Sequence, residues 1–313
     1  MRFGSSVWPW KWDAPYDTAI QRIADTGFRA TELMAWNNDI LVDYYTPETI
    51  DKLRGILAER DLTLSQFMLL VPQLSSGDAE IRKAAIAQYK RGVDVAVDLG
   101  APNINTVTHY PFDITMPRIT DRPHVQVFTV DVPSGLDWRQ NWNEYIASLR
   151  EIVDYADSKG KTFSLEPHPF RYGATTEALL RIIDAVDSPA LRVNLDPSHL
   201  FPAGDIIHVA IHRLEGRVVH CHFSDNDGLT NVHWRPGKGK IDWEKALIAL
   251  KETGFDGVIS LELEDIPGVA RGIAKVPGVY RGYVEATEEF VEEHRIGLAY
   301  LTELAHKVGM TVE

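Results

Sequence analysis

The sequence predicts an α/β fold in which eight parallel strands and the helices between them close into a (β/α)₈ barrel. Three observations favour it. Short runs of apolar or β-branched residues alternate with longer amphipathic stretches, which is the pattern of repeated βα units. Eight such units can be counted along the chain. The 313 residues also suit one barrel domain over residues 1–313, since a barrel needs about 250 residues and tolerates insertions. An open doubly wound sheet is the alternative.

The strands are expected where apolar runs are short, and the helices where the amphipathic stretches are long. Several helical patterns end at a glycine, as in Thr26-Gly-Phe and Leu99-Gly-Ala, which is the residue favoured just past a helix C-terminus. The expected strands are Arg2–Val7, Ala30–Met34, Thr63–Leu70, Asn103–Val107, Thr162–Glu166, Arg192–Asp196, Val218–His222 and Val258–Glu262. The expected helices are Tyr16–Thr26, Pro47–Arg60, Ala79–Leu99, Trp142–Lys159, Thr176–Val186 and Trp243–Thr253.

Two long segments interrupt this rhythm. Tyr110–Arg139 follows the fourth expected strand and is rich in Pro, Asp, Thr and aromatic residues, without a sustained period. A loop of that length in a compact barrel is typical of a lid, a binding loop or a subunit contact. Ile266–Tyr283 is predicted to cross the barrel face as a C-terminal extension, before a last helix from about Glu285 to Lys307.

Composition excludes several classes of protein. The formal net charge is -13, from 45 acidic and 32 basic side chains, which disfavours nucleic acid as a partner. One cysteine allows no intramolecular disulfide, and no apolar run approaches the roughly 18 residues of a membrane span. The first residues lack the apolar core of a secretory signal, so a cytoplasmic protein without membrane partners is expected.

Four acidic or imidazole residues stand at the ends of four expected strands. They are Glu166, Asp196, His222 and Glu262. The carboxyl ends of barrel strands meet at one mouth, and a buried carboxylate without a partner is strongly disfavoured there. A shared divalent cation would balance them. Three oxygen ligands and one nitrogen ligand suit Mn²⁺, Mg²⁺, Co²⁺ or Zn²⁺ better than an ion that prefers thiolates.

Five motifs resemble the sugar phosphate isomerase/epimerase family of xylose-isomerase-like TIM barrels, which includes ketose 3-epimerases and the larger subunits of C-glycoside deglycosidases. They occur in the family's order, and the resemblance covers nearly the whole chain, most strongly residues 160–265. The motifs are Leu165-Glu-Pro, Asn194-Leu-Asp-Pro-Ser-His-Leu, Val219-His-Cys-His-Phe-Ser-Asp, Arg235-Pro-Gly-Lys-Gly-Lys-Ile-Asp-Trp and Gly257-Val-Ile-Ser-Leu-Glu-Leu-Glu-Asp.

The resemblance implies that Glu166, Asp196, His222 and Glu262 hold one divalent ion, with Mn²⁺ expected first. It further implies isomerisation or epimerisation of a sugar, by proton abstraction next to the carbonyl through a metal-stabilised enediolate. Glu166 and Glu262 would then be the acid/base pair. His220 competes with His222 and Glu264 with Glu262. The family's His-x-x-Asp pattern favours His222, and the spacing from Gly257 favours Glu262.

Six further residues are candidates for binding the substrate. By the resemblance, His199 and Arg235 match positions that hold substrate oxygens. His168 is expected to face the mouth because it lies two residues beyond Glu166, and His109 follows the fourth strand. Trp8 and Trp36 lie near the first two strand ends, where an indole ring could stack on a sugar or equally be ordinary packing material.

Other functions remain open. The first alternative is a lyase that acts on 3-oxo-glycosides by β-elimination, like the deglycosidase larger subunits, which associate with a small second subunit. An endonuclease IV-like phosphodiesterase would need more metal ligands and a basic surface, and a non-catalytic sugar-binding barrel is compatible with the fold. A small-molecule sugar or glycoside is the expected ligand, and a homo-oligomer is expected from the family.

Overall fold

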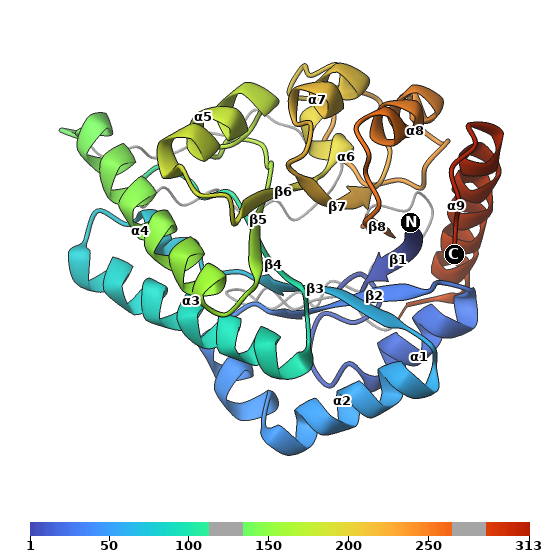
Figure 1. Ribbon diagram of the computed structural model, residues 1–313, viewed down its shortest axis with the longest axis horizontal. Helices are drawn as coiled ribbons and strands as arrows, with labels where there is room; N and C mark the ends of the chain where they lie inside the picture. Colours follow the sequence, from blue (N-terminus) through green and yellow to red (C-terminus); the bar gives the residue numbers. More distant parts are fainter. Residues whose placement is uncertain (113–133, 265–285) are drawn as a thin grey trace.

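The computed structural model describes residues 1–112, 134–264 and 286–313. Its eight strands are all parallel and form a closed barrel in chain order, which confirms the predicted fold (Figure 1). The strands are β1 (Arg2–Ser6), β2 (Ala30–Ala35), β3 (Thr63–Leu69), β4 (Asn103–Val107), β5 (Thr162–Glu166), β6 (Leu191–Leu195), β7 (Val218–Phe223) and β8 (Val258–Leu261). Pairing of β1 with β8, at Ser5 and Leu261 among others, closes the ring.

Helices surround the barrel on the outside, following one another around it in nearly the order of the chain (Figure 1). The α-helices are α1 (Asp17–Thr26), α2 (Pro47–Glu59), α3 (Ala79–Leu99), α4 (Trp138–Ser158), α5 (Thr176–Val186), α6 (Pro197–Leu200), α7 (Ile207–Arg213), α8 (Trp243–Glu252) and α9 (Glu288–Lys307). A π-turn (Ile40–Tyr44) and a 3₁₀ turn (Pro72–Ser75) follow β2 and β3. None of the helices in the described ranges is both long and apolar enough to cross a bilayer.

The inside of the barrel is polar. Outward residues such as Phe67, Phe163 and Leu261 are fully buried against the helix layer. The alternate residues point inward, because side chains on a strand face opposite sides in turn. Barrel interiors are usually filled with branched apolar residues. Here the buried inward residues include Glu32, Gln66, Asn105, Ser164, Asn194, His220, His222 and Ser260.

Local sequence signals explain where several helices begin and end. The side chains of Asp78 and Thr46 accept backbone N–H groups at the starts of α3 and α2, as N-caps do. Gly27 and Gly100 follow α1 and α3 with φ of 110° and 82°, a region that side chains other than glycine rarely enter. The predicted glycine stops at these two helices are therefore confirmed.

The structure corrects some boundaries. Helix α4 begins at Trp138, capped by Asp137, four residues before the predicted start and inside the segment expected to be a loop. Helix α9 begins after the Thr287 cap, three residues later than predicted. Neither α6 nor α7 was predicted, because both are short. Most of the predicted loop (113–133) and the predicted extension over Ile266–Tyr283 lie outside the described residues.

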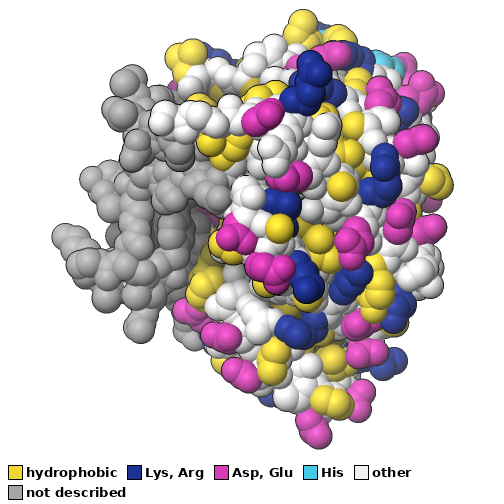
Figure 2. Space-filling view, turned by 90° about the vertical axis from the view of Figure 1, so that its left-hand side faces the viewer, with side chains coloured by type: hydrophobic (Ala, Val, Ile, Leu, Met, Phe, Trp, Pro, Cys, Tyr) yellow, Lys and Arg dark blue, Asp and Glu magenta, His cyan; other side chains and the backbone are white. Residues whose placement is uncertain are grey.

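The outer surface over α3 and α4 carries charges of both signs. Figure 2, which views this side of the molecule, shows acidic and basic side chains interspersed. Between the two helices, Lys90 pairs with Glu151 at 2.7 Å and Arg82 with Glu144 at 3.1 Å. Such partly exposed pairs contribute little to stability individually. The interspersed charges of both signs form no single-sign patch on the described part of this face (Figure 2).

Candidate active site

The four strand-end residues converge at the mouth of the barrel. Glu166 ends β5, Asp196 follows β6, His222 lies in β7 and Glu262 follows β8. Each offers a ligand atom within 4.8 Å of the others, and all four side chains are buried. We call these four residues the mouth cluster. The structure thus brings together the residues that the sequence analysis named as a set.

Hydrogen bonds fix one oxygen of each glutamate in the cluster. Oε2 of Glu166 accepts from the side-chain amides of Asn105 and Asn194, at 3.0 and 3.2 Å. Oε1 of Glu262 accepts from the indole N–H of Trp8 at 2.6 Å. Because one oxygen is fixed, the other oxygen of each carboxylate has a defined direction. These are Glu166 Oε1 and Glu262 Oε2, and each lies 3.1 Å from His222 Nδ1.

Asp196 is fixed in the same way by its own neighbour in the chain. Its Oδ1 accepts from the backbone N–H and the hydroxyl of Ser198, at 2.7 and 2.6 Å. This is also the N-cap of α6. Within the described part of the chain, Asp196 Oδ2 and Glu262 Oε2 are buried and meet no donor in good hydrogen-bond geometry; their neighbours are His199 Nε2 at 3.4 Å and His222 Nδ1 at 3.1 Å. A buried acceptor without a well-placed donor is uncommon and can take a cation instead.

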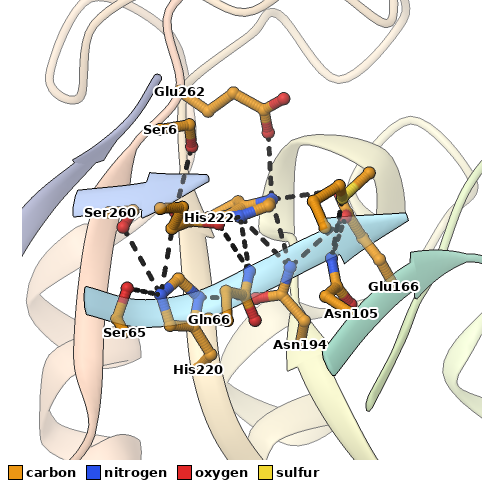
Figure 3. A network of polar contacts seen from close by, with 12 residues as sticks. Ser6, Ser65, Gln66, Asn105, Glu166, Asn194, His220, His222, Ser260 and Glu262 are labelled. Atoms are coloured by element: carbon orange, nitrogen blue, oxygen red, sulfur yellow. Dashed lines mark hydrogen bonds and ion pairs between the residues drawn. The ribbon is translucent and has the colours of Figure 1, made fainter. Parts of the chain in front are cut away.

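His222 connects the cluster to the interior of the barrel (Figure 3). Its Nδ1 faces Glu166 and Glu262, and its Nε2 lies 2.9 Å from Oε2 of Glu32 in β2. Burial disfavours charge on this imidazole, but the three carboxylates raise the pKa of His222 well above its usual value. The three carboxylates therefore favour the protonated form of this ring.

The charges of the cluster fit a divalent cation. Burial raises the pKa of Glu262 to about 7 against the opposing effect of His222. Among the described residues, the ion pairs of Glu166, Asp196 and Glu262 all involve histidine, and none involves Lys or Arg. One imidazolium cannot balance three buried carboxylates. Three oxygens and one imidazole nitrogen that lie within 4.8 Å of one another are ligands that Mn²⁺, Mg²⁺, Co²⁺ or Zn²⁺ accepts.

Three histidines line one side of the cluster. His199 Nε2 lies 3.4 Å from Asp196 Oδ2, and its ring lies 4.1 Å from that of His168 and 4.8 Å from that of His233. Burial lowers the pKa of His199 and His168, so both rings are neutral near pH 7. His168 and His199 were named from the sequence. His233 was missed.

Arg235 and His109 do not reach the mouth cluster in this structure. Arg235 Nε lies 3.3 Å from Glu293 in α9, so its side chain runs toward that helix. His109 Nε2 lies 3.0 Å from the carbonyl oxygen of Val71 and 3.0 Å from the hydroxyl of Tyr89, within the layer between strands and helices. His233, two residues before Arg235, occupies the place beside His199 instead.

The two tryptophans have different surroundings. Trp8 contacts both Glu262, through its N–H, and His222, whose ring meets it edge-on at 5.5 Å. Trp36 lies against Trp12 at 6.3 Å, and its buried indole N–H has no hydrogen-bond partner among the described residues. Trp8 therefore does more than supply an apolar face, because it fixes a carboxylate of the cluster.

Both rivals named from the sequence lie outside the cluster. His220 lies deeper in the barrel, with Nδ1 3.0 Å from Asn194 Oδ1 and Nε2 3.1 Å from the hydroxyl of Ser65. Of the described residues, the group that converges at the mouth contains His222 and Glu262, and neither His220 nor Glu264 belongs to it.

Glu32 was not recognised in the sequence. It lies in the middle of β2, is fully buried and accepts from Gln66 as well as from His222. A signal was available: a glutamate inside a fully buried strand is costly unless it has a partner. Its partner lies 190 residues away, which no local pattern reveals.

Comparison with known proteins agrees with the fold. Residues 20–287 match the family described as xylose isomerase-like TIM barrel, which confirms the resemblance seen in the motifs. D-psicose 3-epimerase from Ruminiclostridium cellulolyticum is 25% identical over 262 residues, covering 82% of this chain and 81% of that protein. An uncharacterized protein from Methanocaldococcus jannaschii is 33% identical over 166 residues, 49% of this chain, so the match spans only 55% of that relative.

A solved structure is similar over nearly the whole length. The crystal structure of D-psicose 3-epimerase with D-tagatose from Clostridium cellulolyticum H10 has a TM-score of 0.74 and 24% identity, and the match covers 97% of this chain and 99% of that one. At this identity the likeness shows a shared fold. The activity has to be argued from the site.

Proposed function

Because the chain belongs to the xylose isomerase-like TIM-barrel family, we propose that it is a divalent-metal-dependent sugar isomerase or epimerase. The substrate is a small ketose, as the names of the epimerase relatives suggest. The observation that carries the proposal is the mouth cluster, in which each of three buried carboxylates has one oxygen fixed by a donor and all four residues offer ligand atoms within 4.8 Å of one another.

Glu166 and Glu262 are proposed as the acid/base pair. They come from β5 and β8, which are three strands apart in a ring of eight, so they approach a bound sugar from nearly opposite sides. One carboxylate takes the C–H proton next to the carbonyl, and the electron pair of that bond moves toward the carbonyl oxygen. The other carboxyl group returns a proton to the opposite face. The step inverts one stereocentre and needs no oxidant or reductant.

The environment of the pair suits proton transfer near neutral pH. Burial raises the pKa of Glu262 to about 7, which is where a group can both accept and donate a proton efficiently. Glu166 instead accepts two hydrogen bonds from the side-chain amides of Asn105 and Asn194. The two glutamates therefore have different environments, as expected for groups that work on opposite faces.

Glu166, Asp196, His222 and Glu262 would hold the ion, with Mn²⁺ proposed first. When bound, a divalent cation polarises the substrate carbonyl and stabilises the negative charge that develops on its oxygen. Trp8, Asn105, Asn194 and Ser198 keep the carboxylates in place. His168, His199 and His233 are proposed to hold sugar hydroxyl groups, since a neutral imidazole has one donor and one acceptor.

Proton exchange with solvent tests the proposal directly. The purified protein is stripped of metal, reloaded with Mn²⁺, Mg²⁺, Co²⁺ or Zn²⁺ and incubated in D₂O with D-psicose, D-fructose or D-tagatose. Mass spectrometry is expected to show deuterium on the carbon next to the carbonyl in one of these sugars, only after reloading. Glu166→Gln and Glu262→Gln should each lower the exchange by about 10²- to 10⁴-fold.

Other outcomes would point to the alternatives. Wild-type protein that binds Mn²⁺ but releases the aglycone from a 3-oxo-glycoside, without exchanging a ketose proton, would be a lyase. Sugar binding without exchange or release would indicate a binding barrel. Cleavage of an abasic DNA strand would indicate a phosphodiesterase. Cytoplasmic location and a homo-oligomer, with or without a small second subunit, remain predictions.

A further inference from the structure

Glu32 lies inside the barrel, below the mouth cluster. It is in the middle of β2 and is 0% exposed. Its Oε2 is 2.6 Å from the side-chain nitrogen of Gln66 and 2.9 Å from Nε2 of His222, and its Oε1 accepts from the hydroxyl of Ser6 at 3.1 Å. A fully buried carboxylate is costly, and no packing requirement explains a charged residue at this position.

We propose that Glu32 is a positioning residue that keeps a proton on Nε2 of His222 and so leaves Nδ1 to the cation. This inference rests on the proposed function, because it concerns the same metal site. A neutral imidazole carries its proton on one nitrogen only, and a metal can bind only the other. A carboxylate that accepts from the outer nitrogen fixes the tautomer and the ring orientation, and it makes the inner nitrogen a better ligand.

Gln66 could in principle favour the opposite tautomer. Its side-chain nitrogen lies 3.1 Å from His222 Nε2, so it could donate there if that nitrogen carried no proton. Its oxygen accepts from Asn103 at 2.9 Å, which fixes the amide with its nitrogen toward Glu32, at the shorter distance of 2.6 Å. The charged oxygen is the stronger acceptor for both N–H groups. Oε2 of Glu32 therefore accepts hydrogen bonds from both Gln66 and His222.

A second metal ion is the main alternative explanation for Glu32. Glu32, His220 and His222 have possible ligand atoms within 4.8 Å of one another. The ring nitrogens of His220, however, already lie 3.0 Å from Asn194 Oδ1 and 3.1 Å from the hydroxyl of Ser65. A second ion would have to displace one of these neutral partners, and it would also compete with His222 for Glu32 Oε2. The hydrogen bond to His222 accounts for Glu32 without a second ion.

Metal affinity separates these possibilities. Metal-free wild type, Glu32→Gln and Glu32→Asp are titrated with Mn²⁺, and free Mn²⁺ is followed by electron paramagnetic resonance. Wild type should bind one ion per chain, and Glu32→Gln about 10- to 100-fold more weakly, as for other residues that support a metal ligand. Ser65→Ala is the matched control, because it removes a buried contact of His220 and none of His222.

Two readouts distinguish positioning from a general effect on folding. Proton-coupled ¹⁵N spectra of labelled histidine in the Zn²⁺-loaded wild type should show one imidazole protonated at Nε2 and bound through Nδ1. Saturating Mn²⁺ should restore most of the turnover of Glu32→Gln, because the defect lies in affinity. Thermal unfolding confirms that each variant is folded, and the wild-type spectrum decides the tautomer even if no variant folds.

The opposite results would overturn the inference. Equal Mn²⁺ affinity in wild type and a folded Glu32→Gln, an equal loss in Ser65→Ala, two ions per chain in wild type, or a proton on Nδ1 of the loaded protein would each exclude this role for Glu32. Failure of the wild type to bind any ion would instead refute the proposed function. The two failures are therefore distinguishable.

Discussion

The two halves of the barrel contribute differently to the site. The second half, β5–β8, supplies the four residues of the mouth cluster. The first half supplies side chains that hold them. Trp8, after β1, donates to Glu262, and Asn105 in β4 donates to Glu166. Glu32 in β2 lies against His222. Three of the four members of the cluster are thus supported from the opposite half of the ring.

In this closed barrel, one half supplies the residues of the site and the other half orients them. The residues of the mouth cluster converge because the strand ends meet at one mouth. Convergence alone does not decide which carboxylate oxygen points to the centre. Donors from the neighbouring strands of the first half do, because they occupy the other oxygen: β1 lies beside β8, and β4 lies beside β5. The first half therefore controls the geometry of groups that it does not contain.

Loss of a ligand should have the largest effect. Asp196→Asn keeps the shape of the side chain, but removes a charge that lies in the centre of the cluster. We expect Mn²⁺ affinity to fall by more than about 100-fold, because loss of a ligand should exceed the typical cost of losing its support. Calorimetric titration of the metal-free protein measures it. Unchanged affinity would mean that the ion, if bound, lies elsewhere.

Loss of the Trp8 donor should come next. Trp8→Phe leaves Glu262 Oε1 without its 2.6 Å hydrogen bond while keeping most of the ring. A hydrogen bond to a charged group contributes about 1.5–3 kcal/mol, so kcat/KM on the best ketose should fall by about 10- to 100-fold. Trp36→Phe is the matched control, since the indole N–H of Trp36 has no partner in the described structure. Equal losses in both variants would argue against a role for the Trp8 donor.

Loss of the Asn105 donor should be milder. Asn105→Leu removes one N–H from Glu166 Oε2, but Asn194 still donates to the same oxygen at 3.2 Å. We expect kcat/KM to fall by about 10-fold, near the lower limit for a charged hydrogen bond. The double variant with Asn194→Leu should lose more than the product of the single changes. If it loses no more, the two amides act independently.

The smallest expected effect is on the pH dependence of stability, and it comes from His109. This residue lies in the first half of the barrel and does not contact the mouth cluster. Burial, aided by the charge of Arg171, lowers the pKa of His109 to about 3. The unfolded chain therefore binds a proton below about pH 6.5 that the folded chain excludes, and stability falls as the pH falls toward 3. Near pH 5, the free energy of unfolding of wild type should fall by about 1.4 kcal/mol more per pH unit than that of His109→Gln, as measured by urea unfolding. If the free energies of unfolding of the two proteins fall equally with pH, the prediction is wrong.

The sequence predicted the half of the site that follows a local rule. Each residue of the mouth cluster stands at or next to a strand end, and the repeated βα units of the sequence define where that end lies. The same repeat predicts the fold. The supporting residues follow no such rule. Glu32 is in the middle of a strand, and its value depends on His222, 190 positions further on. Pairings of that kind exist only once the ring has closed.

Irregular loops were harder to interpret. Arg235 was named because its motif matches the family; in the structure it pairs with Glu293, and its role in substrate binding stays a prediction. His233 lies beside His199 instead, in a segment with no period from which its direction could be read. An isolated antiparallel bridge between Asp225 and Trp234 folds this segment back on β7. Such a bridge depends on contacts across the loop, not on propensity.

The hydrogen bond from Trp8 to Glu262 joins residues 254 positions apart. A nascent chain emerging from the ribosome cannot make this contact until the eighth strand has been synthesised. Contacts of such long range slow folding, because much chain entropy is lost before they form. The mouth cluster, and with it the proposed cation site, should therefore take its final geometry only when the last strand has joined the first.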